Sequence, residues 1–205
     1  MRILIAAVLL LALSGCASTS RRTERAAANA DWRAVATEGD RKRLRDWRGD
    51  FASALQKARA AGHGAEIDAE GRLLMPDAAL GGGLPNGEYR CRIFKLGARG
   101  EGLLDYIAYS GFRCRVTQDG LVQYFAKLTG SQRPMGKIYR GDAMRGIFLG
   151  TLMLGDEMRP MRYGSDPDRG LAGWVERVEE RKWRIVLPAP RFESLTDVVE
   201  LIPAN

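Results

Sequence analysis

From Glu88 onward, apolar and polar residues alternate with a period of two, and no other feature of the chain restricts its fold as strongly. The segment from Tyr89 to Ile93 alternates apolar residues with arginines, and the segment from Phe112 to Val116 repeats this arrangement. A period of two places successive side chains on opposite faces of a β-strand. Further runs of strand-like composition follow, and turn signals separate several of them: Leu103 to Tyr109, Leu121 to Leu128, Lys137 to Arg140, Ile147 to Leu154, Gly173 to Glu179, Trp183 to Leu187 and Val198 to Ile202.

Many short strands at close spacing, with no helical period between them, predict an antiparallel sheet. We therefore expect residues 88–205 to form a mainly β domain, which is α+β overall once an N-terminal helix is included. The sheet either closes into a lipocalin-like β-barrel or stacks as a sandwich. The barrel is preferred, because a meander of about eight strands removes its exposed edges by closing.

An amphipathic helix is predicted before the sheet, within residues 31–64. Thr37 or Asp40 can cap its start, and Gly62 follows its last turn as a C-cap glycine would. The helix should pack on the barrel, either over one opening or along the wall, and residues 65–87 form a connecting segment. The apolar residues of the helix recur at steps of three or four, the spacing of one helix face: Leu44, Trp47, Phe51, Leu55 and Ala58.

The N-terminus has the pattern of a secretory signal peptide over residues 1–15. Its apolar run from Ile3 to Leu13 is shorter than the roughly 20 residues that span a bilayer. The segment from Leu13 to Cys16 resembles the lipobox of bacterial lipoproteins, which implies cleavage before Cys16 and acylation of that cysteine with chains such as palmitate. The alternatives are an ordinary signal peptide with a chance cysteine, or an N-terminal helix of a cytosolic protein.

Residues 16–30 are small, polar and rich in arginine, and we expect them to form a flexible tether behind the lipid. Ala17 stands where lipoproteins kept at the inner membrane have Asp, so the resemblance implies a periplasmic domain anchored to the outer membrane. The net charge is +7, and residues 17–64 hold eleven Lys and Arg against six Asp and Glu. This basic segment can lie against anionic head groups or can be a solvated helix face. Nucleic acid is not expected as a partner, because no recognition motif is present.

The chain contains three cysteines, and the predicted export indicates the chemical state of each one. Once Cys16 carries lipid, Cys91 and Cys114 remain as a pair in an oxidising compartment, both on the apolar faces of their strands. We expect a disulfide between them; two buried free thiols are the alternative. No metal site is expected, because two thiolates and the single, distant His63 make no ligand set.

No nucleophile elbow, zinc-protease helix, P-loop, dinucleotide fingerprint or Ca²⁺ loop is present, and we expect no cofactor. Three polar loop clusters, near residues 129–134, 155–157 and 163–169, could line one polar pocket if they share an end of the barrel. Alternatively, Asp and Gly build the turns while the arginines pair with nearby carboxylates and hold the loops shut. The candidate binding residues are Ser131, Gln132, Arg133, Asp156, Glu157, Asp168 and Arg169.

The chain also resembles a family of secreted Gram-negative proteins that contain a domain of unknown function, over roughly residues 31–204. The resemblance rests on segments such as Tyr89–Arg92, Phe112–Arg115 and Thr129–Arg133 together with Trp183, and it implies no activity. A looser similarity, in size and architecture, is to periplasmic lysozyme-inhibitor lipoproteins and lipocalin-like carriers. We predict a non-catalytic envelope lipoprotein that binds a small molecule or an envelope protein. The alternatives are a cell-wall hydrolase that uses Asp and Glu, or a lysozyme inhibitor.

Overall fold

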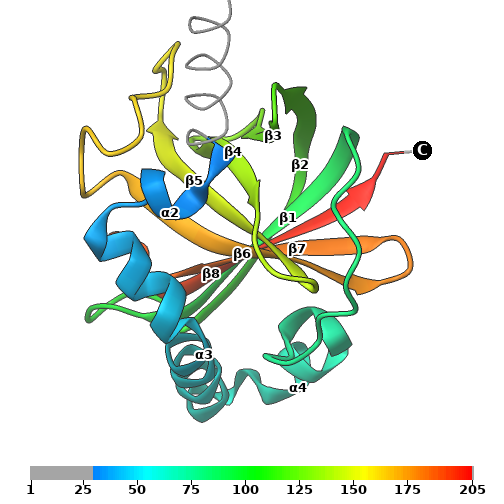
Figure 1. Cartoon of the computed structure of the whole chain (residues 1–205). Helices are drawn as coiled ribbons and strands as arrows, with labels where there is room; N and C mark the ends of the chain where they lie inside the picture. The colour runs from blue at the N-terminus through cyan, green and yellow to red at the C-terminus, as the bar shows by residue number, and fades with distance from the viewer. Residues whose placement is uncertain (1–29, 205) are drawn as a thin grey trace, which may run out of the picture.

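The computed structural model describes residues 30–204, and its main element is a closed barrel of eight antiparallel strands (Figure 1). Each strand pairs with the next one in the chain, and the barrel closes where β1 pairs with β8. This confirms the predicted mainly β fold with a barrel. The strands are β1 (Gly87–Ala98), β2 (Tyr106–Asp119), β3 (Val122–Lys127), β4 (Gln132–Arg140), β5 (Arg145–Leu154), β6 (Gly170–Glu179), β7 (Lys182–Pro188) and β8 (Ser194–Pro203).

Strand β2 joins two runs that the alternation pattern separates. Its residues 106–109 and 112–116 continue one another, and the register with β1 shifts between Cys91 and Ile93. Gly111 lies at this shift with a φ of 79°, a backbone conformation that glycine adopts without a steric penalty. A bulge of this kind bends a strand without ending it, which explains why a break in the pattern does not mark a loop.

The inward-facing residues of the strands form one apolar core inside the barrel. Phe125 and Phe148 meet edge to face at 5.8 Å between ring centroids. The bonded pair Cys91–Cys114 lies in the same layer. Close packing of this kind fills the middle of a small barrel and leaves no channel through it.

A second apolar core lies outside the barrel, beneath helix α3 (Glu38–Ala58). Trp47 and Phe51 of α3 are almost completely buried there, together with Phe94 and Val186 of the barrel wall. Of the two predicted placements, the helix therefore takes the one along the wall, as Figure 1 also shows. Thr37 caps its start by accepting a hydrogen bond from the backbone N–H of Asp40 at 3.1 Å.

The segment after α3 contains more helix than predicted. A π-helical turn η1 (Arg59–His63) leads into α4 (Gly64–Ala69) and the 3₁₀-helix η2 (Gly71–Leu74). Gly62 interrupts the helical backbone with a φ of 99°, so it acts as the predicted left-handed residue but within a kink between helices. Before α3, the short helix α2 (Trp32–Val35) starts the described chain.

A buried arginine of the barrel wall holds one of these helical segments in place. Arg184 of β7 is completely buried, and its Nη2 lies 2.5 Å from Oε2 of Glu176. Its other donors bond to the backbone carbonyls of Leu73 at 2.6 Å and Met75 at 2.8 Å. A charge buried this deeply requires such partners, so Arg184 ties η2 to the sheet.

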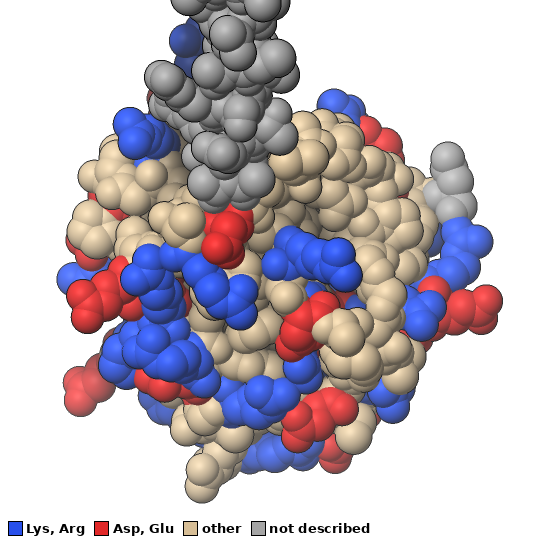
Figure 2. All heavy atoms as spheres, viewed as in Figure 1, with Lys and Arg blue, Asp and Glu red and all other residues tan. Residues whose placement is uncertain are grey.

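The face of the molecule in Figure 2 carries basic side chains over α2 and α3, with acidic ones between them. Several of the arginines make local contacts: Arg48 lies 3.1 Å from Asp77, and Arg33 lies 4.5 Å from the ring centroid of Trp32. No helix within residues 30–204 has the length and apolarity needed to cross a bilayer. The predicted signal peptide, the tether residues up to 29 and the lipidation site Cys16 lie outside the described residues.

Candidate functional site

The packed core leaves a separate cavity at each end of the barrel. One cavity, of about 300 Å³, opens between the β1–β2, β3–β4 and β7–β8 loops, and we call it the lysine mouth. The other, of about 400 Å³, lies at the opposite end, and we call it the arginine mouth. Side chains that line the lysine mouth include Ile93, Lys95, Tyr109, Phe112, Lys127, Ser131, Gln132, Pro134, Leu152, Leu187, Glu193, Asp197 and Val199.

Lys127, the last residue of β3, points into the lysine mouth because it shares the inward face of the strand with Phe125. Its side chain is 2% exposed. Its Nζ donates to the backbone carbonyls of Thr129 and Gln132, both at 2.8 Å, and lies 3.5 Å from the ring centroid of Phe112. A cation over an aromatic face is stabilised by the ring quadrupole.

The β3–β4 turn is shaped to let the Lys127 ammonium group reach these carbonyls. Gly130 has a φ of 86°, and a Cβ at this position would lie 2.8 Å from both Lys127 Nζ and the Phe112 ring. A larger residue would therefore displace the ammonium group. The glycine between Thr129 and Ser131 is thus explained by a close approach as well as by the turn.

The Lys127 ammonium group lacks a carboxylate partner, which is unusual for a buried cation. Within residues 30–204 no carboxylate lies at ion-pair distance from its Nζ. Burial, and to a smaller extent the neighbouring cations Arg133 and Lys95, lower the pKa of Lys127 to about 8. Of the groups that the structure describes, only the two backbone carbonyls and the Phe112 ring therefore compensate the positive charge on Lys127.

Lys95, on β1, has the opposite environment in the same cavity. Its Nζ lies 3.0 Å from Glu193 and 3.3 Å from Asp197. Burial would lower the pKa of Lys95, but the two carboxylates outweigh it and raise the pKa. Glu193 also accepts a hydrogen bond from Gln132 at 3.1 Å, and Ser194 donates to Asp197. These groups form a closed network that is satisfied without a ligand.

Two of the predicted binding residues, Ser131 and Gln132, line the lysine mouth. Arg133 is used differently, because its Nη2 donates to the carbonyls of Gly155 and Glu157, both at 2.9 Å. These bonds hold the β5–β6 loop against the start of β4. Arg133 therefore holds this loop in place and does not line the lysine mouth.

The β5–β6 loop carries the remaining predicted residues and is held by its own ion pair. Arg169 Nη1 lies 3.1 Å from the carboxylate of Glu157, which also accepts the backbone N–H of Leu154 at 2.8 Å. The Leu154 N–H and then the Arg169 guanidinium keep the pKa of Glu157 below its usual range. Asp168 lies 2.9 Å from Arg191, and Asp156 is exposed.

The sequence-based candidates did not include Lys95, Lys127, Glu193 and Asp197. A signal for the two lysines exists in the alternation pattern, because each occupies an inward position of a strand whose neighbours on that face are apolar. Glu193 ends the β7–β8 loop and Asp197 lies in β8, and only the closure of β8 onto β1 brings them to Lys95. That pairing is not visible in the sequence.

Within the described part of the chain, no group of His, Cys, Asp and Glu residues is arranged to hold a metal ion. His63 lies 3.1 Å from Glu66, and its ring stacks on Tyr106 at 5.3 Å between centroids. Its contacts are those of a surface residue that packs a helix against the barrel.

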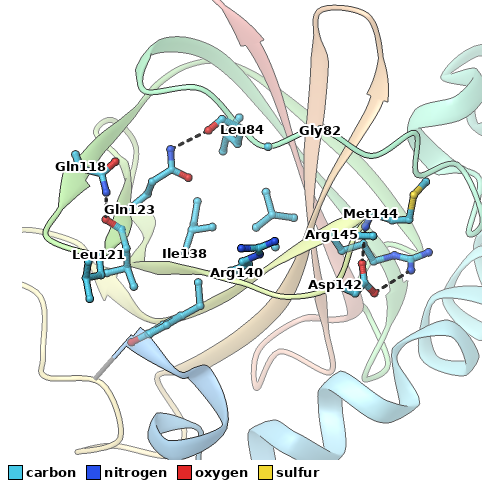
Figure 3. Close-up of a pocket in the computed structure, with 16 residues that line it drawn as sticks. Gly82, Leu84, Gln118, Leu121, Gln123, Ile138, Arg140, Asp142, Met144 and Arg145 are labelled. Carbon is cyan, nitrogen blue, oxygen red and sulfur yellow. Dashed lines mark hydrogen bonds and ion pairs between the residues drawn. The ribbon is translucent and has the colours of Figure 1, made fainter. Parts of the chain in front are cut away.

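The arginine mouth at the other end has a different lining, which Figure 3 shows. Gln118 and Gln123 lie on one side of it, and Asp142 and Arg145 lie on the other, with Arg140 between them. Several of these polar groups bond to each other or to the backbone. Arg145, for example, lies 2.5 Å from Glu176 and 3.5 Å from Asp142.

Comparison with known proteins places the chain in a family without an assigned activity. Residues 32–201 match the family model described as a domain of unknown function, DUF4893. No curated protein and no solved structure gives a significant match to the chain. The match spans α3, strands β1 to β7 and β8 as far as Leu201, and the chain therefore belongs to the DUF4893 family.

Proposed function

We propose that this protein is a periplasmic lipoprotein, held through Cys16 to the outer membrane, whose barrel binds a small anionic molecule in the lysine mouth without catalysis. The leader and the lipobox-like segment support export and anchoring. The observation that carries the binding proposal is Lys127, a buried cation that faces a cavity and has no carboxylate partner in the described structure.

The lining of the lysine mouth matches what small-molecule sites require. Such sites are mostly apolar and contain a few converging polar groups that fix the ligand. Here Phe112, Leu152 and Val199 supply apolar surface, and the Lys127 ammonium supplies the charge. A carboxylate with an apolar chain would bury the chain against these residues and neutralise Lys127. A charge-assisted hydrogen bond of this kind contributes about 1.5–3 kcal/mol.

The loop carboxylates support binding more than hydrolysis. A glycoside hydrolase needs two carboxyl groups that face one bond across an open cleft. Glu157 instead bonds to Arg169 and to the Leu154 backbone, where it holds the β5–β6 loop in place. This arrangement favours the binding function over a cell-wall hydrolase built on Asp156 and Glu157.

The binding proposal is tested by calorimetric titration with octanoate and with the uncharged 1-octanol. We expect octanoate to bind the full-length protein at least about tenfold more tightly than the alcohol. Lys127→Met should remove this preference. The matched control is Lys137→Met, which removes a lysine from the outer wall, where Lys137 lies 3.1 Å from Asp119. An octanoate affinity that Lys127→Met leaves unchanged would rule out the proposed contact.

Anchoring is tested separately, by growing cells that express the chain with radiolabelled palmitate. The label should enter the protein and co-fractionate with outer membranes, and Cys16→Ala should abolish both. An unlabelled, full-length product in the soluble fraction would contradict export and anchoring but leave the ligand proposal untouched.

A further inference from the structure

The arginine mouth combines an apolar floor with polar groups at its rim. Leu84, Ile138 and Val175 form the floor; they are at most 6% exposed and belong to the apolar core of the barrel. The cavity above them measures about 400 Å³. A concave site with an apolar base and a few converging polar groups is the usual form of a small-molecule site.

Arg140 is the one arginine of this lining that the described structure leaves unpaired. It is the last residue of β4, on the strand face that Ile138 turns inward, and it lies exposed at the rim of the cavity. Within residues 30–204 its guanidinium makes no hydrogen bond and no ion pair. Figure 3 shows it in the middle of the lining, between Ile138 and Arg145. Arg145, by contrast, is held by Glu176 and Asp142.

Gln123 offers a fixed hydrogen-bond acceptor in the same cavity. Its Nε2 donates to the carbonyl of Leu84 and to Oδ1 of Asn86, both at 2.8 Å. These two bonds fix the orientation of the amide and use both of its N–H donors. Its Oε1 accepts no hydrogen bond from the described residues, so it can receive one from a ligand.

We propose that the arginine mouth is a second binding site, specific for an N-acylated amino acid with an apolar side chain. The planar guanidinium of Arg140 matches a carboxylate with two parallel hydrogen bonds. Gln123 Oε1 accepts the amide N–H next to that carboxylate. The apolar side chain packs on Leu84, Ile138 and Val175. This site is independent of the ligand proposed for the lysine mouth.

The test compares three ligands by calorimetric titration of the full-length protein. N-acetylphenylalanine carries the carboxylate, the amide N–H and an apolar ring. N-acetylphenylalaninamide lacks the charge, and 3-phenylpropionate lacks the N–H. We expect N-acetylphenylalanine to bind at least about tenfold more tightly than its amide, and 3-phenylpropionate to bind more weakly than N-acetylphenylalanine.

Two variants test whether the preference for N-acetylphenylalanine over its amide arises in this cavity. Arg140→Gln should bring the affinities for N-acetylphenylalanine and its amide together. Arg90→Gln removes the same charge from the exposed outer face of β1 and should leave the discrimination intact. The proposal is overturned if the acid and its amide bind the unaltered protein equally, if neither binds at millimolar concentration, or if the discrimination survives Arg140→Gln.

Discussion

Lys127 shows how a single residue links the stability of this barrel to its proposed function. An ammonium group in an apolar cavity is disfavoured unless it has compensating partners. Here two carbonyls and the Phe112 ring compensate it in part, and its pKa falls to about 8. The rest of the free-energy cost of burying this charge destabilises the folded protein. A bound anion would offset that cost.

The lowered pKa of Lys127 predicts a pH-dependent stability. In the unfolded chain a lysine keeps its proton up to about pH 10.4, so between pH 8 and 10 the unfolded state binds more protons than the folded state. The free energy of unfolding should therefore rise with pH in this range. Relative to Lys127→Met, we expect the unaltered protein to gain about 1–3 kcal/mol between pH 7 and 10. Denaturant unfolding at several pH values measures this, and parallel curves for the two proteins would contradict it.

At the scale of single residues, the sequence identifies some residues of the site and misses others for a physical reason. Ser131 ends a polar turn and Gln132 begins the next strand, so local composition alone indicates both of them. Lys95 and Lys127 look like ordinary strand residues until strand register shows that they face inward. The carboxylate partners of Lys95 depend in addition on the pairing of β1 with β8, which joins segments about a hundred residues apart in the chain.

At the scale of elements, helix α3 and helix η2 are held by different forces. The apolar stripe of α3, including Trp47 and Phe51, packs on the barrel wall, and its spacing makes this predictable. The attachment of η2 depends on Arg184, which bonds to backbone carbonyls at Leu73 and Met75. Such bonds depend on the tertiary structure, so no sequence pattern predicts them.

We predict that Arg184→Met destabilises the protein by about 3–5 kcal/mol, because it leaves Glu176 with one partner fewer in a buried site. The double variant Arg184→Met/Glu176→Leu should lose less than the sum of the single variants. Arg115→Met serves as the control: Arg115 pairs with Glu88 in an exposed position, where an ion pair contributes little. Denaturant unfolding is measured for the unaltered protein, both single variants, the double variant and Arg115→Met, and equal effects of Arg184→Met and Arg115→Met would contradict the assignment.

At the scale of the whole molecule, the closed barrel follows from the alternation pattern, since closing removes every sheet edge. The break in the pattern near Gly111 is the instructive exception. This break predicts two separate strands, whereas the structure has one strand that contains a bulge. A local change of register looks like a turn in the sequence. The division of the interior into two mouths depends on which side chains meet in the middle, which the pattern does not specify.

The bond between Cys91 and Cys114 lies inside the barrel and cross-links β1 to β2. On the chain-entropy model a cross-link over 23 residues stabilises by about 3 kcal/mol. We expect Cys91→Ala/Cys114→Ala to lose about this amount and to unfold at a lower temperature. Alkylation of the denatured protein without reductant, followed by intact-mass measurement, should label neither cysteine. Two adducts would show free thiols instead.

The most direct test of the binding account is the pKa of Lys127 itself, measured by NMR of ¹⁵N-labelled lysine side chains and assigned by its loss in Lys127→Met. Without ligand the account predicts a value near 8. With saturating octanoate the pKa should rise, because a neighbouring carboxylate favours the charged amine. A pKa that octanoate leaves unchanged would contradict the claim that the lysine mouth receives an anion.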